Sequence, residues 1–313
     1  MPRVSVLMPS YNHSQFVSEA INSVLDQTLD DWELIIVDDD SKDESQKILT
    51  KFTEVDDRIK LRVHEKNMGI AKTLNDCFKY SKGQYIAFIA SDDVWMGDKL
   101  EKQVNILDND NDLVVFSEGL IIDNNSNLTG ERTSEKYKNA VINGFVFEDI
   151  INCWVNGSSM ILKRDNAKNI RFNEKLKYLN DTQFYIDLGY KYQYCYMKEP
   201  LSKYRLHETN SSHGVIKDIK GWYKDSFFLC LYVFDKYGDE LSKKAIKNIF
   251  YKTCIVPVML GTNNQLLSLN NIIYPIIIPS AFIFCCTRKF VRKITKKRIG
   301  RLFNFLFSIE LKK

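Results

Sequence analysis

The segment from Tyr85 to Met96 reads YIAFIASDDVWM and joins an apolar strand to two adjacent acids. Residues 85–90 are apolar enough for a strand that is buried in the middle of a sheet. Asp92 and Asp93 follow Ser91 directly, and two neighbouring carboxylates are costly to desolvate unless positive charge lies close to them. The segment therefore predicts a buried strand that ends in a polar, ligand-binding turn.

The residues before this segment alternate between strand and helix patterns. Apolar strands are expected at 4–9, 32–40 and 59–65, and helices with one apolar face at 14–28, after 41 and after Gly69. Ser41 and Glu44 have the spacing of a capping box for the second helix. This order predicts an α/β fold with a mostly parallel, Rossmann-like sheet flanked by helices.

Polar clusters follow three of the expected strands. They are residues 9–12 (PSYN), 38–40 (DDD) and 91–93 (SDD). Any single acid among them has an ordinary alternative role as a helix cap or a solvated loop residue. Because ligands bind at the carboxyl ends of parallel strands, the three clusters together predict one binding crevice.

The acids in these clusters suit a hard divalent cation such as Mn²⁺ or Mg²⁺. The chain contains neither a G-x-x-x-x-G-K-[ST] loop nor a G-x-G-x-x-G turn. We therefore expect a metal, and not a glycine-rich backbone loop, to neutralise the phosphates of a nucleotide-diphosphate ligand.

Composition and charge outline the rest of the chain. The 313 residues carry a net charge of +4, yet ten Lys or Arg and one acid lie between 287 and 313. Residues 112–214 mix strands with a helix near 180–192, and helices are expected from 215 onward. Seven cysteines lack metal-ligand spacing, and a strand expected at residue 4 leaves no room for a signal peptide. A cytoplasmic protein without a nucleic-acid partner is the expectation.

Six motifs occur in a familiar order: PSYN (9–12), VDDDSKD (37–43), NMGIAKTLN (67–75), GQYIAFIASDD (83–93), NEKLKYLND (173–181) and YRLH (204–207). Residues 1–210 thereby resemble the family 2 glycosyltransferases, which are inverting enzymes of the GT-A fold. The resemblance is greatest to enzymes of bacterial capsule, O-antigen or exopolysaccharide synthesis. It implies a GT-A domain at 1–214, with a nucleotide-binding half at 1–111 and an acceptor half at 112–214, and a helical extension at 215–313.

The resemblance also implies roles for individual residues. A sugar would pass from a nucleotide-diphosphate donor, most often a UDP-sugar, to a hydroxyl of a glycan or lipid-linked acceptor. The nucleotide would be bound by Pro9, Tyr11, Asn12, Asp39, Lys72 and Asp92. Asp93 and His207 would hold the metal, and Asp181 would be the catalytic base. The family's glycine is replaced by Asp40, a residue type that tolerates positive φ.

Other proteins share parts of this pattern. A nucleotidyltransferase would carry a glycine-rich loop after the first strand, and a processive synthase would carry several apolar spans of about 20 residues. A non-catalytic sugar-nucleotide-binding or scaffold protein of the same fold stays open as the alternative. His13, His64 and His213 receive no role, and Trp95 and Trp154 suit either a sugar site or the core.

The C-terminal region has a membrane-binding pattern. Residues 272–286 are almost wholly apolar, but they are shorter than a span and include Pro275 and Pro279. Residues 288–307 are basic and roughly amphipathic. We expect peripheral attachment to the inner face of the cytoplasmic membrane, with a basic helix packed on protein as the alternative.

Overall fold

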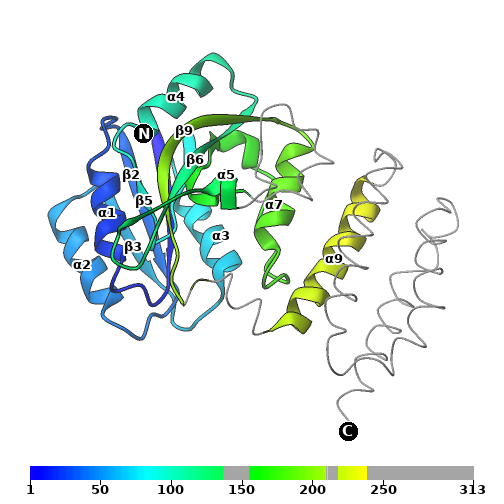
Figure 1. Ribbon diagram of the computed structural model, residues 1–313, viewed down its shortest axis with the longest axis horizontal. Coiled ribbons are helices and arrows are strands. Elements are labelled where there is room, and N and C mark those ends of the chain that lie inside the picture. Colours follow the sequence, from blue (N-terminus) through cyan, green and yellow to red (C-terminus); the bar gives the residue numbers. More distant parts are fainter. Residues whose placement is uncertain (137–154, 209, 211–217, 238–313) are drawn as a thin grey trace, which may run out of the picture. The chain divides into compact units, whose positions relative to one another are not determined.

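The computed structural model describes residues 1–136, 155–208, 210 and 218–237 (Figure 1). The chain forms two compact units, Met1–Leu229 and Cys230–Lys313. Of the second unit, the description covers residues 230–237, which belong to helix α9 (Ile219–Tyr237). The segments predicted to form the basic tail and the apolar stretch before it lie outside the described residues, as does most of the expected helical extension.

The first half of the sheet is the parallel one that the sequence predicts. Its elements are β1 (Val4–Ser10), α1 (Val17–Leu25), β2 (Trp32–Asp38), α2 (Ser45–Val55), β3 (Ile59–Val63), α3 (Ile70–Tyr80) and β4 (Tyr85–Phe88). The strands lie in the order β3-β2-β1-β4, and each neighbouring pair is parallel. The order confirms the α/β class.

The second half of the sheet mixes strand directions. Its elements are β5 (Val94–Trp95), α4 (Lys99–Asn109), β6 (Leu113–Ile122), β7 (Leu128–Arg132), α5 (Thr133–Lys136), β8 (Ile161–Lys163), α7 (Asn180–Gly189) and β9 (Gln193–Arg205). The sheet continues from β4 through β8, β6 and β9 to β5, and β7 pairs with β6. β6 and β9 are parallel, whereas β8 is antiparallel to both of its neighbours. Helix α4 and strand β5 were not predicted.

Alternation along the strands gives the sheet two apolar faces. Val4, Val6 and Met8 of β1 pack with buried residues of α1, α2 and α4. Leu7 of β1 points to the other face, where α3 contacts β1 and β2 (Figure 1). Gly83 precedes β4 because a Cβ there would lie 2.4 Å from the backbone nitrogen of Ser5.

An aromatic cluster joins α7 to this second face. The rings of Phe172 and Phe184 stack with centroids 4.2 Å apart. Phe184 also contacts Phe78 of α3 and Phe88 of β4. All four rings are buried, so the cluster fixes the position of α7 relative to the sheet.

Some local predictions fail and others hold. The capping box is wrong, because the Ser41 hydroxyl donates to Asp38 and α2 begins at Ser45 without a side-chain cap. Asp40 has a φ of 63°, so the prediction that it replaces a turn glycine is confirmed.

Trp95 is a core residue whose Nε1 donates to the Ser158 carbonyl, and Trp154 lies outside the described residues. Within the described part, no helix has the length and apolar character needed to cross a membrane.

Candidate functional site

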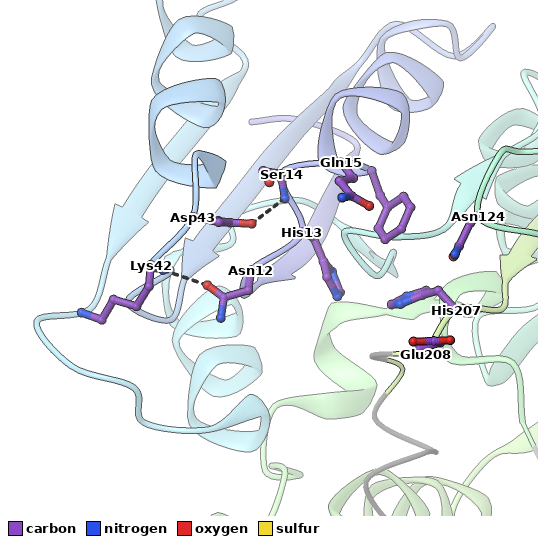
Figure 2. A pocket seen from close by; sticks show the side chains of 10 residues that line it. Asn12, His13, Ser14, Gln15, Lys42, Asp43, Asn124, His207 and Glu208 are labelled. Carbon is purple, nitrogen blue, oxygen red and sulfur yellow. Dashed lines mark hydrogen bonds between the residues drawn. The ribbon is translucent and has the colours of Figure 1, made fainter.

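A cleft of about 580 Å³ opens beside the carboxyl end of β1. Its walls come from the loop after β1, the loop after β2, the turn after β6 and the segment after β9. The lining residues are Asn12, His13, Ser14, Gln15, Phe16, Lys42, Asp43, Asn124, His207 and Glu208 (Figure 2). The cleft thus lies at neighbouring strand ends, and of the three predicted polar clusters it is lined by Asn12, together with the predicted metal ligand His207.

The end of β1 presents its side chains beside the end of β2. Ser10 pairs with Asp38, and the Asp39 backbone nitrogen donates to the Ser10 carbonyl at 2.8 Å. Tyr11 follows with 43% of its surface exposed. Asn12 has a φ of 53°, and its Oδ1 accepts the Lys42 backbone N–H at 2.7 Å. Pro9, Tyr11, Asn12 and Asp39 are therefore brought together as expected.

The Asp39 carboxylate is held by three donors. The backbone nitrogens of Met68 and Gly69 donate to it at 2.7 and 2.8 Å, and His64 Nδ1 lies 2.8 Å from its Oδ1. Gly69 has a φ of +86°, a conformation that other residues rarely adopt, and it begins α3. Asp39 therefore fixes the loop between β3 and α3 as well as lying at the crevice.

Lys72 reaches Asp39 only indirectly. Its Nζ pairs with Asp76 Oδ1 at 2.5 Å, and the other Asp76 oxygen lies 3.0 Å from His64 Nε2. His64, for which the sequence predicts no role, thus bridges Asp39 and Asp76. Lys72, which is predicted to bind the nucleotide, therefore belongs to an ionic network with Asp76 and His64.

Asp92 lies against two histidines. His207 Nε2 lies 2.8 Å from Asp92 Oδ2, and His13 Nδ1 lies 4.0 Å from Asp92 Oδ1. One ligand atom from each of the three residues lies within 4.8 Å of the others. Burial acts to raise the pKa of Asp92, but the His207 hydrogen bond and the charge of His13 outweigh it and lower that pKa.

Asp93 points away from this group and is 2% exposed. Its Oδ1 accepts the Arg205 backbone N–H at 2.9 Å, and its Oδ2 accepts the Ser158 hydroxyl. Burial, and then the Asp92 charge, raise the pKa of Asp93 well above its ordinary range. Both oxygens of Asp93 therefore accept a hydrogen bond within the protein, and the side chain is buried.

Arg205 brings a buried positive charge to this turn, and that charge acts to lower the pKa of Asp93 against the larger effects of burial and Asp92. Its side chain is fully buried, and its Nε donates to the Asp92 carbonyl at 2.7 Å. The guanidinium also bonds the Asp123 carbonyl and pairs with Glu19. Arg205 lies within the quoted YRLH motif, but only the pairing of β9 with β5 reveals its contact with the Asp92–Asp93 turn.

Asp181 occupies the first turn of α7. Its Oδ1 accepts the Thr182 backbone N–H at 2.6 Å, which is the helix-terminal role that any acid can take there. The side chain reaches solvent, yet partial desolvation by the surrounding protein raises its pKa. Burial, and then the Asp181 charge, raise the pKa of Tyr185, whose hydroxyl would lie 2.8 Å from a Cβ placed on Gly157. The next residue, Ser158, contacts Asp93, so close contacts connect α7 with the Asp92–Asp93 turn.

A divalent cation fits the group formed by His13, Asp92 and His207. Imidazole nitrogens and carboxylate oxygens are the donors that Mn²⁺ and related metals use in proteins. The His207 backbone nitrogen donates to Asn210 Oδ1, and Asn210 Nδ2 donates to Asp92 Oδ2 at 3.4 Å, so a second layer of hydrogen bonds orients two of the three side chains.

A comparison with known families identifies the chain. Residues 5–169, just over half of its length, match the model described as glycosyl transferase family 2. The chain belongs to this family. Over 223 residues it is 31% identical to the uncharacterized glycosyltransferase MJ1057 of Methanocaldococcus jannaschii, covering 70% of this chain and 76% of MJ1057.

Two further proteins are similar to this family member. Over 123 residues it is 42% identical to the UDP-Glc:alpha-D-GlcNAc-diphosphoundecaprenol beta-1,3-glucosyltransferase WfgD of Escherichia coli, covering 39% of this chain and 48% of WfgD. The crystal structure of S. aureus TarS 1-349 in complex with UDP-GlcNAc matches with a TM-score of 0.62 and 18% identity, covering 85% of this chain and 75% of that one. The structural likeness confirms the GT-A fold of the family.

Proposed function

We propose that the protein is an inverting glycosyltransferase of cell-surface polysaccharide synthesis. It transfers a sugar from a nucleotide-diphosphate donor, a UDP-sugar, to a hydroxyl of a glycan or lipid-linked acceptor. Family membership and the UDP-linked donors named for WfgD and TarS support the reaction class. The observation that carries the proposal is the pairing of Asp92 with His207 beside a cleft at the ends of the strands.

The nucleotide binds along the ends of β1 and β2 in this proposal. Tyr11 offers an exposed aromatic face for the base, and Pro9 and Asn12 shape the adjoining backbone. A carboxylate has about four acceptor positions, and Asp39 uses three of them, which leaves one for a ring N–H. Lys72 contributes its positive charge at the edge of this site, where Asp76 holds the ammonium group in place.

A Mn²⁺ or Mg²⁺ ion would be held by Asp92 and His207, and not by Asp93. Asp92 and the two histidines each bring one ligand atom within 4.8 Å of the others, whereas Asp93 is 2% exposed and bonds the Arg205 backbone and Ser158. Asp93 instead positions Asp92, because it anchors the turn to Arg205 and Ser158. When bound, the cation stabilises the negative charge that grows on the departing diphosphate.

Asp181 removes the proton from the acceptor hydroxyl. A base with a raised pKa is better matched to proton transfer near neutral pH than an ordinary aspartate. The acceptor oxygen attacks the anomeric carbon as the bond to the diphosphate breaks, and the proton passes to Asp181. Attack from the face opposite the leaving group inverts the anomeric centre, so an α-linked donor gives a β-glycoside.

The acceptor and the location of the enzyme are linked in this proposal. A lipid-linked acceptor lies at a membrane surface, and the basic residues between 287 and 313 would hold the enzyme at an anionic leaflet. The enzyme is then cytoplasmic and peripheral at the inner face of the membrane.

Isothermal titration with UDP tests the donor site. Binding with Mn²⁺ should be at least about tenfold tighter than binding with EDTA, because a cation at Asp92 would add positive charge for the diphosphate. Equal affinity under both conditions would rule out the proposed metal-linked donor site. A non-catalytic sugar-nucleotide-binding protein would pass this test, and turnover measurements on Asp181 separate it from an enzyme.

A further inference from the structure

His13 lies beside both Asp92 and the predicted ligand His207. The two imidazole rings point toward one another, with centroids 5.5 Å apart and planes at 87° (Figure 2). His13 Nδ1 is the ring nitrogen that faces Asp92, at 4.0 Å, and it also lies 2.8 Å from the Ser91 hydroxyl. A nitrogen from each imidazole therefore faces the same carboxylate.

The backbone holds His13 in this position. Its nitrogen donates to the Ser45 hydroxyl at 3.0 Å, and its carbonyl accepts the N–H groups of Phe16 and Val17 at 2.9 Å. The preceding residue, Asn12, has a positive φ that turns the chain toward the Asp92–Asp93 turn. Phe16 packs beside both histidines, with its ring centroid 6.1 Å from that of His13 and 4.8 Å from that of His207. The imidazole is thus preorganised.

The metal-ligating atoms of His13, Asp92 and His207 differ from those of a site built from carboxylates alone. Oxygen ligands suit Mg²⁺, whereas imidazole nitrogens favour transition metals such as Mn²⁺, Co²⁺ and Zn²⁺. One carboxylate and two imidazoles fill three positions of a metal and leave others for the oxygens of a diphosphate. A second histidine in the group therefore shifts the choice of metal.

We propose that His13 is a third protein ligand of the cation and sets a preference for Mn²⁺ over Mg²⁺. This inference rests on the proposed function, because it concerns the same cation site. The alternative is a structural role, in which His13 only hydrogen-bonds Ser91 and shapes the cleft wall.

The test measures the metal itself, without donor or turnover. Mn²⁺ is titrated into wild-type protein, His13→Ala and His13→Gln, with free Mn²⁺ followed by electron paramagnetic resonance. His64→Asn is the matched control, because it removes an imidazole bonded to Asp39 and Asp76 instead of Asp92. Both His13 variants should bind Mn²⁺ at least about tenfold more weakly, since even loss of an outer partner of a metal ligand costs about 10–100-fold. The control should match wild type.

Electron spin echo envelope modulation of bound Mn²⁺ separates a ligand from a supporting residue. The wild type should show two coordinated histidine nitrogens and each His13 variant one, and the ratio of Mn²⁺ to Mg²⁺ affinity should fall in the variants. Unchanged affinity, or weaker binding with both nitrogens retained, would overturn the assignment of His13 and leave the proposed function intact. Absence of Mn²⁺ binding to wild type would overturn both. His13→Gln keeps a polar group near Ser91. If His13→Ala does not fold, the Mn²⁺ measurements on His13→Gln show whether His13 is a ligand.

Discussion

His207 Nε2 lies 2.8 Å from Asp92 Oδ2, although 115 positions separate the two residues in the sequence. The adjacent Asp93 instead accepts hydrogen bonds from Arg205 and Ser158. The two neighbouring carboxylates therefore have different surroundings: Asp92 contacts His207, which lines the cleft, and Asp93 anchors the turn.

Substitution of each acid by asparagine distinguishes these tasks. Asp92→Asn should abolish the gain in UDP affinity that Mn²⁺ provides, because it removes the negative charge facing the cation. Asp93→Asn should keep that gain, because an amide oxygen still accepts the Arg205 N–H. Isothermal titration of UDP with Mn²⁺ and with EDTA measures both effects. The reverse pattern would return the metal-ligand role to Asp93.

Arg205 should be a major contributor to stability. Its buried guanidinium holds the Asp92 carbonyl, the Asp123 carbonyl and Glu19, so Arg205→Leu leaves several acceptors without a donor. We expect the free energy of unfolding in urea to fall by about 3–5 kcal/mol. The exposed pair of Lys47 with Glu44 provides the control, and Lys47→Met should cost less than about 1 kcal/mol. Similar losses for the two variants would contradict this role.

Lys99 should lower the stability of the protein at neutral pH. It is fully buried, its Nζ bonds Gln103 Oε1 at 2.7 Å, and burial lowers its pKa well below the usual range. Because the unfolded chain binds this proton more readily, stability should rise with pH between the lowered pKa and about 10.4.

Lys99→Met should remove that pH dependence. It should also raise the free energy of unfolding at pH 7 by more than the ~0.5 kcal/mol typical of a surface substitution. The exposed Lys102 serves as the control through Lys102→Met. Denaturant titrations at several pH values would contradict the account if Lys99→Met were destabilising at pH 7 and kept the wild-type slope.

The pH dependence of turnover reports on Asp181. A general base acts in its ionised form, so the rate should rise with pH as Asp181 loses its proton. Because its pKa is raised, the acid limb should lie above the ~3.9 of an unperturbed aspartate. Turnover at saturating donor and metal gives the profile, and a rate that stays flat down to pH 4 would contradict the assignment.

The basic tail should bind anionic membranes. Liposomes with anionic lipid should pellet the full chain but not a version that ends near Asn270, because each basic residue near such a surface contributes about 1 kcal/mol. Neutral liposomes serve as the control. Equal pelleting of both versions, or no preference for anionic lipid, would leave the tail as a protein-packing element.

Much of the fold could be predicted because its signals are local. The alternation of strands and helices up to β4 follows from apolar periodicity, and the positive φ of Asp40 follows from its place in a known turn. The capping box failed because Ser41 bonds Asp38, a contact that competes with the cap and has no sequence signature.

The division of roles within the site could not be predicted, because it depends on contacts between distant residues. Whether Asp92 or Asp93 faces the cleft is decided by Ser158 and Arg205, which are 65 and 112 positions away from Asp93. His13 follows one expected strand, His64 lies near the end of another, and neither was given a role, so only the arrangement of the strand ends reveals their contacts with Asp92 and Asp39.

Release of UDP from UDP-sugars in the presence of Mn²⁺, compared between wild type and Asp181→Asn, tests the central claim most directly. The exposed acid Asp57 provides the matched control through Asp57→Asn. The account predicts turnover for wild type and the control, and a loss of about 10²-fold or more for Asp181→Asn, with UDP affinity kept within a few-fold. Equal turnover for wild type and Asp181→Asn, or no UDP release by any of the three proteins from any UDP-sugar, would contradict it.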